Sequence, residues 1–133
     1  VFKPISEMTA DDYQASLSNK LLGQIDLVLQ GQRYLNDGGS ITLTTGVINR
    51  DPIVAGSAAS MVNSGVEGFV YAASFELGRQ LRVNVVSPNL LEESVEKYKD
   101  YFPGYASVSA EKVAKAFRKS VFGIQSGQVI CVS

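Results

Sequence analysis

The fold of this chain is decided by residues 39–89, which read GSITLTTGVINRDPIVAGSAASMVNSGVEGFVYAASFELGRQLRVNVVSPN. A short run of apolar and β-branched residues (40–45) comes first and is typical of a strand. A polar loop follows, and then a long segment rich in small residues (57–77), which predicts a helix. The run LRVNVV (81–86) predicts a second strand, which ends near Pro88. Two strands joined by a helix predict a βαβ unit with parallel strands.

The flanking sequence continues this alternation of helices and strands. Thr9 is a predicted N-cap, and apolar residues at helical spacing then predict a helix that ends near Leu35. Residues 90–108 read as irregular and aromatic, Ser109 is the cap of a further predicted helix, and residues 128–132 predict a last strand. This order favours a parallel α/β sheet with right-handed crossovers. Such sheets bind ligands at the carboxyl ends of their strands.

Composition excludes several classes of function. The 133 residues carry a net charge of −1 and no histidine, so this chain holds no Ser-His-Asp or Cys-His mechanism and no His-based metal site. The Lys and Arg residues are scattered, which argues against a nucleic-acid or membrane surface. No apolar run is long enough to span a bilayer. The single cysteine, Cys131, fits a reduced, cytoplasmic setting.

Four segments resemble the short-chain dehydrogenase/reductase family. The run LRVNVVSP at residues 81–88 is the most specific, and residues 39–43, 64–77 and 127–132 match in the same order. In that family they correspond to the sixth strand, the fifth strand, the helix with a catalytic Tyr and Lys, and the seventh strand. The resemblance implies an α/β fold: the C-terminal part of a doubly wound Rossmann sheet, with residues 1–133 in one domain and the N-terminal strands absent.

The resemblance also implies where catalytic residues should stand. The family uses an Asn, a Ser and a Tyr-x-x-x-Lys pair, in which Tyr is the acid/base and Lys lowers its pKa. Matching residues 68–70 to the family places the Tyr position at Ala59 and the Lys position at Asn63. The Ser position falls on Gly46, with Thr45 beside it. None of these positions holds its usual residue, so the resemblance implies a divergent member.

The family's Asn position falls on Lys20 when Gly23 is matched to the family's glycine. Lys20 and Asn63 thus hold each other's usual residue, and a reciprocal exchange would keep an ammonium group in the site. The alternative is drift in a site that has lost its use. Neither interpretation restores an acid/base, because Ala59 has no polar group. The neighbouring hydroxyls need a base to act and more often serve as caps or strand residues; they are Thr44, Thr45, Ser57 and Ser60.

Two further groups of residues could face a ligand. Arg50 and Asp51 follow the first predicted strand, where a solvated loop pair is the more common arrangement. Tyr98, Tyr101 and Tyr105 lie in what the resemblance makes the substrate-binding lid, where tyrosines more often shape a pocket than donate protons.

The resemblance implies a dinucleotide cofactor, NAD or NADP, bound near Asn63, Pro88, Asn89 and Leu90. Pro88-Asn89 replaces the family's Pro-Gly, and Asn tolerates left-handed backbone. The chain has no glycine-rich phosphate-binding motif, and Val1 falls about where the family's fourth strand would end. The first four strands are therefore expected to be absent or unseen, through processing or because the chain is a piece of a longer protein.

Two functions stay open at this point. One is a divergent NAD(P)-dependent oxidoreductase with a small-molecule substrate, and the other is a non-catalytic nucleotide-binding or scaffold protein that keeps the fold. The resemblance implies a homo-dimer or homo-tetramer through residues 9–35 and 57–77. Small residues on the second of these segments predict the close approach of a partner helix: Gly65, Gly68, Ala72 and Ala73.

Overall fold

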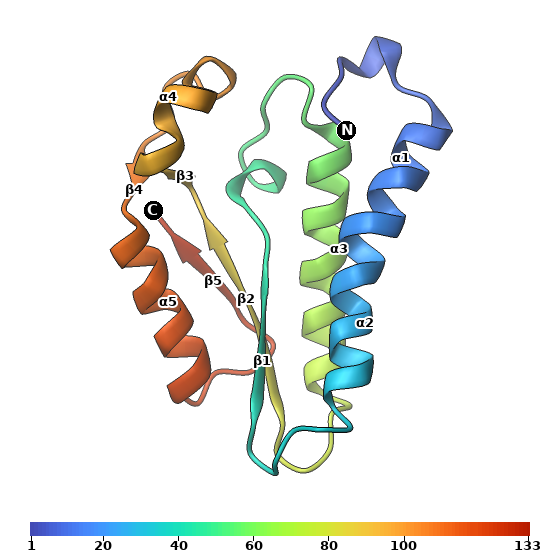
Figure 1. The fold of residues 1–133 in the computed structure, drawn as a ribbon, viewed down its shortest axis with the longest axis vertical. Coiled ribbons are helices and arrows are strands. Elements are labelled where there is room, and N and C mark those ends of the chain that lie inside the picture. Colours follow the sequence, from blue (N-terminus) through green and yellow to red (C-terminus); the bar gives the residue numbers. More distant parts are fainter.

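A computed structural model describes all of residues 1–133. Its core is a parallel sheet with strand order β1 (Ser40–Thr44), β2 (Arg82–Pro88) and β5 (Val129–Val132). The predicted α/β class and the three parallel strands are confirmed. In Figure 1 the sheet lies between α5 on one side and α2 with α3 on the other.

The helices that cover the sheet follow the predicted order. They are α1 (Ala10–Ser16), α2 (Leu22–Gly31) and α3 (Ser57–Ser74) on one face, and α5 (Ala110–Phe122) on the other. Thr9 and Ser109 are N-caps as predicted; each side chain accepts a hydrogen bond from a backbone N–H in the first turn. At the first cap, hydrogen bonding from the Thr9 backbone, together with Lys3, lowers the pKa of Asp12.

The side chains of the central strand β2 are apolar on both faces of the sheet, and helices cover both faces. Val83 and Val85 pack against α2 and α3 in a buried apolar cluster, while Val86 packs against Ala116 of α5. Because successive side chains point to opposite faces of a strand, a strand covered on both faces reads as a nearly continuous apolar run. Two polar side chains of β2, those of Asn84 and Ser87, are nevertheless fully buried.

Asn84 joins β2 to the segment that returns from α5 to β5. Its amide nitrogen donates to the Gln125 carbonyl at 2.8 Å and to the Ser120 hydroxyl at 3.2 Å. Its amide oxygen accepts from the Gln128 N–H at 3.1 Å. Buried polar groups are stable only when they are hydrogen-bonded, and this one has three partners. One side chain therefore fixes where β5 begins beside β2.

Arg82, two residues earlier on the same face of β2, stabilises the end of α5. Its guanidinium donates to the carbonyl oxygens of Ser120 and Val121, both at 2.7 Å, and to that of Gln125 at 3.0 Å. The last carbonyls of a helix have no partner inside the helix, so a cation there satisfies them.

The structure corrects several sequence-based expectations. The first helix is interrupted by a π-helical turn at Leu17–Leu21. Gly56, not Ser57, is the N-cap of α3, and the Ser57 hydroxyl lies 2.8 Å from that of Tyr13. The segment expected to be irregular contains two short strands, β3 (Leu90–Leu91) and β4 (Ser107–Val108), and between them the short helix α4 (Val95–Tyr98), which has a 3-10 turn on each side. The sequence does not indicate these strands, because two residues are too few to show a periodic pattern.

Two of the four small residues of α3 contact their own chain instead of being open to a partner helix. A Cβ atom at Gly65 would lie 2.9 Å from a methyl carbon of Leu21, so Gly65 admits the π-helical turn of its own chain. Ala73 packs against the core cluster. Gly68 and Ala72 are exposed and remain available to a partner. No helix of the structure combines the length and apolar character that crossing a membrane requires.

Replacing Asn84 by Ala should lower the free energy of unfolding of the intact protein by about 2–3 kcal/mol, because buried partners lose their hydrogen bonds. Asn36→Ala is the matched control, since Asn36 is exposed and its side chain forms no hydrogen bond. Urea denaturation compares the two variants. Equal stability of the two would contradict the role given to Asn84.

Candidate active site

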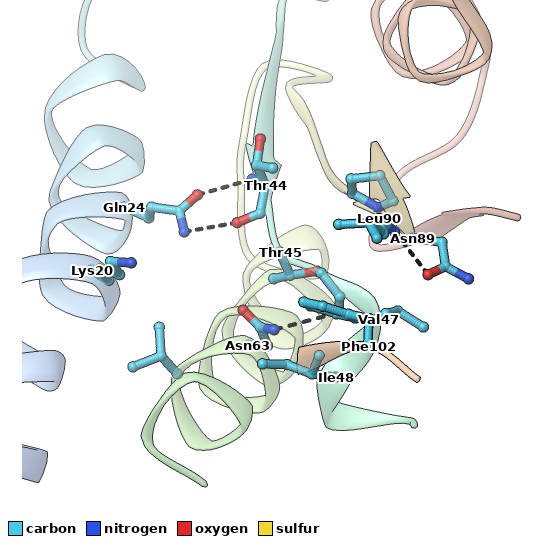
Figure 2. Close-up of a pocket in the computed structure, with 13 residues that line it drawn as sticks. Lys20, Gln24, Thr44, Thr45, Val47, Ile48, Asn63, Asn89, Leu90 and Phe102 are labelled. Atoms are coloured by element: carbon cyan, nitrogen blue, oxygen red, sulfur yellow. Dashed lines mark hydrogen bonds between the residues drawn. The ribbon is translucent and has the colours of Figure 1, made fainter. Parts of the chain in front are cut away.

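A cavity of about 310 Å³ opens at the carboxyl ends of β1 and β2, where parallel sheets bind ligands. Its walls come from the ends of both strands, from α3 and from the helix formed by α1 and α2. Figure 2 shows how these side chains converge. The lining residues are Lys20, Gln24, Thr44, Thr45, Gly46, Val47, Ile48, Val62, Asn63, Pro88, Asn89, Leu90 and Phe102.

Seven of the eight residues predicted for the site line this cavity. They are Lys20, Thr45, Gly46, Asn63, Pro88, Asn89 and Leu90. Ala59 does not line it, although it lies on α3 one turn before Asn63. The structure thus brings together residues that are up to 70 positions apart in the chain (Lys20 and Leu90).

Asn63 and Gly46 face each other across the cavity wall. The Asn63 amide nitrogen donates to the Gly46 carbonyl at 3.4 Å. A Cβ atom on Gly46 would lie 3.7 Å from that nitrogen, which is ordinary van der Waals contact. The site therefore has space for a small side chain at Gly46 but holds none.

Lys20 lies within the π-helical turn and is the only ionisable side chain that lines the cavity. Such turns insert an extra residue into a helix and often occur at functional sites. The Lys20 side chain forms no hydrogen bond or ion pair within the chain, so its ammonium group is free to meet a ligand. Lys20 and Asn63 share the cavity without a direct hydrogen bond.

Gln24, one turn beyond Lys20, fixes this helix to the end of β1. Its side-chain amide donates to the Thr44 carbonyl at 3.0 Å and accepts from the Thr44 N–H at 2.9 Å (Figure 2). This pair of bonds imitates a neighbouring strand at the open edge of β1. Nothing in the local sequence indicated it, because the contact depends on where the helix crosses the sheet.

The segment after β2 differs from the expectation for Asn89. Its backbone is not in the left-handed region, which in this chain holds only Ala55, Arg79 and Gln80 among the non-glycine residues. Instead, the Asn89 N–H donates to the Val132 carbonyl at 2.9 Å, and its side chain accepts from the Leu90 N–H at 2.7 Å. The chain therefore leaves β2 extended, still bonded to β5.

A network around Glu67 holds the floor of the cavity. The Glu67 carboxylate accepts from the Thr45 hydroxyl at 3.0 Å, from the Asn49 amide at 2.6 Å and from the Arg50 guanidinium at 3.1 Å. Arg50 also donates to the buried Ser87 hydroxyl at 2.8 Å. The expected solvated pair with Asp51 is wrong: Arg50 joins the ends of β1 and β2 to α3. Sequence reasoning missed Glu67, whose only signal is its position one turn after Asn63.

The lid residues take two different roles. The Tyr105 hydroxyl donates to the carbonyl oxygens of Asp51 and Pro52, which attaches the lid to the loop after β1. Burial, and then the nearby Asp51, raise the pKa of Tyr105, so it stays a donor. Tyr98 and Tyr101 line a second, adjoining cavity.

Comparisons with known proteins identify the family. A family model described as enoyl-(acyl carrier protein) reductase matches residues 1–124. The structure of the protein lin1944 from Listeria innocua is similar with a TM-score of 0.97 and 49% identity, over 99% of this chain and 66% of that one. The hydroxynaphthalene reductase-like protein Arp2 from Metarhizium brunneum is 32% identical over 95 residues, which is 66% of this chain.

A short chain dehydrogenase from Burkholderia cenocepacia, solved with NADP, shares the fold at 20% identity, with a TM-score of 0.81 over 100% of this chain and 60% of that one. The chain belongs to the short-chain dehydrogenase/reductase family, which confirms the resemblance seen in the sequence. It spans 34% of the length of the Metarhizium protein and 66% of that of the Listeria protein.

Replacing Glu67 by Gln should lower the free energy of unfolding by about 1–2 kcal/mol. The reason is that the Arg50 guanidinium, whose side chain is 36% exposed, loses its charged partner. Glu76→Gln is the control, since Glu76 is an exposed residue just after α3. Urea denaturation of the intact protein measures both. A Glu67→Gln variant as stable as the control would show that the network does not hold the cavity floor.

Proposed function

We propose that the intact protein is an NAD(P)-dependent oxidoreductase of the short-chain dehydrogenase/reductase type, divergent at its catalytic positions. The observation that carries this proposal is the gathering of the family's site positions around one cavity at the carboxyl edge of the sheet. A cavity with convergent polar groups in this position is the expected place for a cofactor and a substrate.

The proposed cofactor is NAD or NADP, held near Asn63, Pro88, Asn89 and Leu90. Support comes from relatives of the same fold, one in complex with NADPH and one with NADP. When bound, a nicotinamide cofactor supplies or accepts the hydride. The residues present fit this role because the end of β2 offers an uncharged, extended backbone beside Asn63. In this proposal, residues 1–133 form the C-terminal half of one Rossmann domain, as their partial coverage of their relatives suggests.

The chain's own residues limit the proton transfer. Ala59 has no acid to give, and Gly46 has no hydroxyl with which to position a carbonyl oxygen. Lys20 is the one ionisable group at the cavity, so its ammonium is the one charged donor that can supply a hydrogen bond or a proton to a carbonyl oxygen there. In this proposal, the exchange of residues between positions 20 and 63 keeps an ammonium group at the site, supplied by Lys20.

A second candidate is a non-catalytic nucleotide-binding or scaffold protein. The observation that favours it is that neither Ala59 nor Gly46 has a reactive side-chain group, although the cavity itself is present. Titration of the full-length protein with NADH and NADPH, followed by turnover of simple carbonyl compounds, separates the two candidates. No binding of either dinucleotide would reject the oxidoreductase and leave only a scaffold role, and binding without any turnover would favour a non-catalytic nucleotide-binding protein.

Turnover by the intact protein should be very slow, because a positioned acid or base typically contributes about 10²–10⁴-fold to the rate. Lys20→Met should reduce it further, by tenfold or more. The combined change Gly46→Ser, Ala59→Tyr and Asn63→Lys should raise it at least tenfold by restoring the family's groups. Steady-state oxidation of NADPH measures each variant.

The matched control for this restoration is Ser64→Lys, on the exposed side of α3. Robust wild-type turnover that survives Lys20→Met would reject the assignment, since the true acid would then lie elsewhere.

The protein is also proposed to be a homo-oligomer, a dimer or tetramer, through α2 and α3. Large apolar side chains are exposed on these two helices, and a closed two-fold interface would bury them. Leu22, Leu27 and Leu29 are 47–55% exposed, Tyr71 is 62% and Phe75 is 76% exposed. Gly68 and Ala72 lie among the exposed residues of α3 and leave space for close approach.

Ala72→Glu should dissociate this oligomer, because a carboxylate would be buried without a partner at the centre of the contact. Sedimentation velocity at micromolar concentration measures the change, with Ala106→Glu in the exposed lid as the control. A wild-type monomer, or an oligomer unaffected by Ala72→Glu, would contradict this interface.

A cytoplasmic location is proposed on Cys131, which is exposed and unpaired. Free exposed thiols persist best in reducing compartments.

A further inference from the structure

A second cavity, of about 490 Å³, adjoins the first beneath the lid. The two share Lys20, Ile48, Leu90 and Phe102 in their walls, so they meet along a common boundary. Its volume lies within the range of about 300–1,000 Å³ that is typical of small-molecule sites. A ligand can therefore extend from one cavity into the other.

The walls of the second cavity are almost entirely apolar. Eight of its ten lining residues are hydrophobic, and the aromatic ones are Phe2, Tyr98, Tyr101 and Phe102. Burying polar groups against such walls without hydrogen-bond partners is unfavourable. Sugars, polyols and phosphorylated compounds are therefore poor occupants, whereas an aromatic ring fits these walls well.

The charge in this cavity is confined to one place. Lys20 and Ser94 are the two polar residues of the wall, and Lys20 is the one that also lines the first cavity. Its ammonium group therefore lies at the boundary between the apolar cavity and the proposed cofactor site. A ligand with an apolar body and a single oxygen acceptor at one end matches this distribution.

We propose that the site takes an aromatic or similarly apolar carbonyl compound, with its ring in the second cavity and its carbonyl oxygen at the Lys20 ammonium. That this compound is a substrate rests on the proposed oxidoreductase function, whereas its binding does not. Lys20 then both selects a carbonyl and directs it toward the face where the cofactor is proposed to bind.

The test compares two ligands of one carbon skeleton on the full-length protein: 4-phenylbutan-2-one and butylbenzene. Isothermal titration calorimetry gives both dissociation constants, with dihydroxyacetone as a polar carbonyl compound. Both phenyl compounds should bind at least tenfold more tightly than dihydroxyacetone. Lys20→Met should weaken the ketone at least fivefold and leave butylbenzene unchanged or tighter, because only the ketone accepts a hydrogen bond. Lys112→Met, an exposed lysine of α5, is the control.

A second variant tests the apolar cavity itself. Tyr101→Glu should weaken both phenyl compounds at least tenfold, since it places a carboxylate in the apolar wall. Tyr101 is 55% exposed, so the substitution should not prevent folding, and Tyr34→Glu, at an 84% exposed position, is its control. Tyr98→Glu provides a second change in the same wall.

The outcomes separate this inference from the proposed function. Dihydroxyacetone binding as tightly as the ketone, or unchanged binding in both tyrosine variants, would overturn the apolar site. Equal weakening of both phenyl compounds in Lys20→Met would overturn the carbonyl assignment. NADPH titration of the same preparations reports the proposed function independently: dinucleotide binding without ketone binding rejects only the inference, and ketone binding without dinucleotide binding rejects only the function.

Discussion

The buried amide of Asn84 is the constraint on which the sheet depends. A parallel sheet covered on both faces has little tolerance for a polar side chain in its central strand, and this one is accepted because three partners satisfy it. Those partners all belong to the end of α5 and the return to β5. The register of β5 beside β2 and the position of α5 therefore depend on one side chain. The cavity lies at the carboxyl end of the same strand, so its shape depends on this register as well.

The hydrogen bonds around Glu67 connect β2 to the candidate site. Once β2 is fixed, the buried Ser87 hydroxyl near its carboxyl end becomes a fixed partner for Arg50, and Arg50 meets the Glu67 carboxylate. Thr45 and Asn49 complete the arrangement from the chain that follows β1. The loop after β1 is thus bonded to both strands and to α3. The cavity is preformed by polar contacts beneath it, and its upper wall is free to be apolar.

Much of this fold could be predicted from the sequence, because its elements have strong local signals. The structure confirms the strand predicted at residues 81–88, the caps Thr9 and Ser109, and the order of helices and strands, all of which depend on neighbouring residues in the sequence. The site positions were found through family resemblance, and most of them converge. The π-helical turn, the Gln24 bonds and the Glu67 network could not be predicted, because each arises from packing between distant segments. The short strands within residues 90–108 were missed because two residues are too few to show a pattern.

The residues that hold the sheet together are largely a different set from those at the candidate site. Arg82 and Asn84 carry contacts that fix β2, and Pro88 pairs with Val132 of β5, whereas Ala59 and Gly46 hold no polar side-chain group. A site with no remaining ligand has no physical need of an unpaired cation beside an apolar cavity, since exposed apolar walls are a cost to solubility. Lys20 stands at that boundary on a π-helical turn that Gly65 accommodates. The cavity, the unpaired ammonium and the space made for its turn are consistent with one another, and they support the proposal that this site binds a ligand.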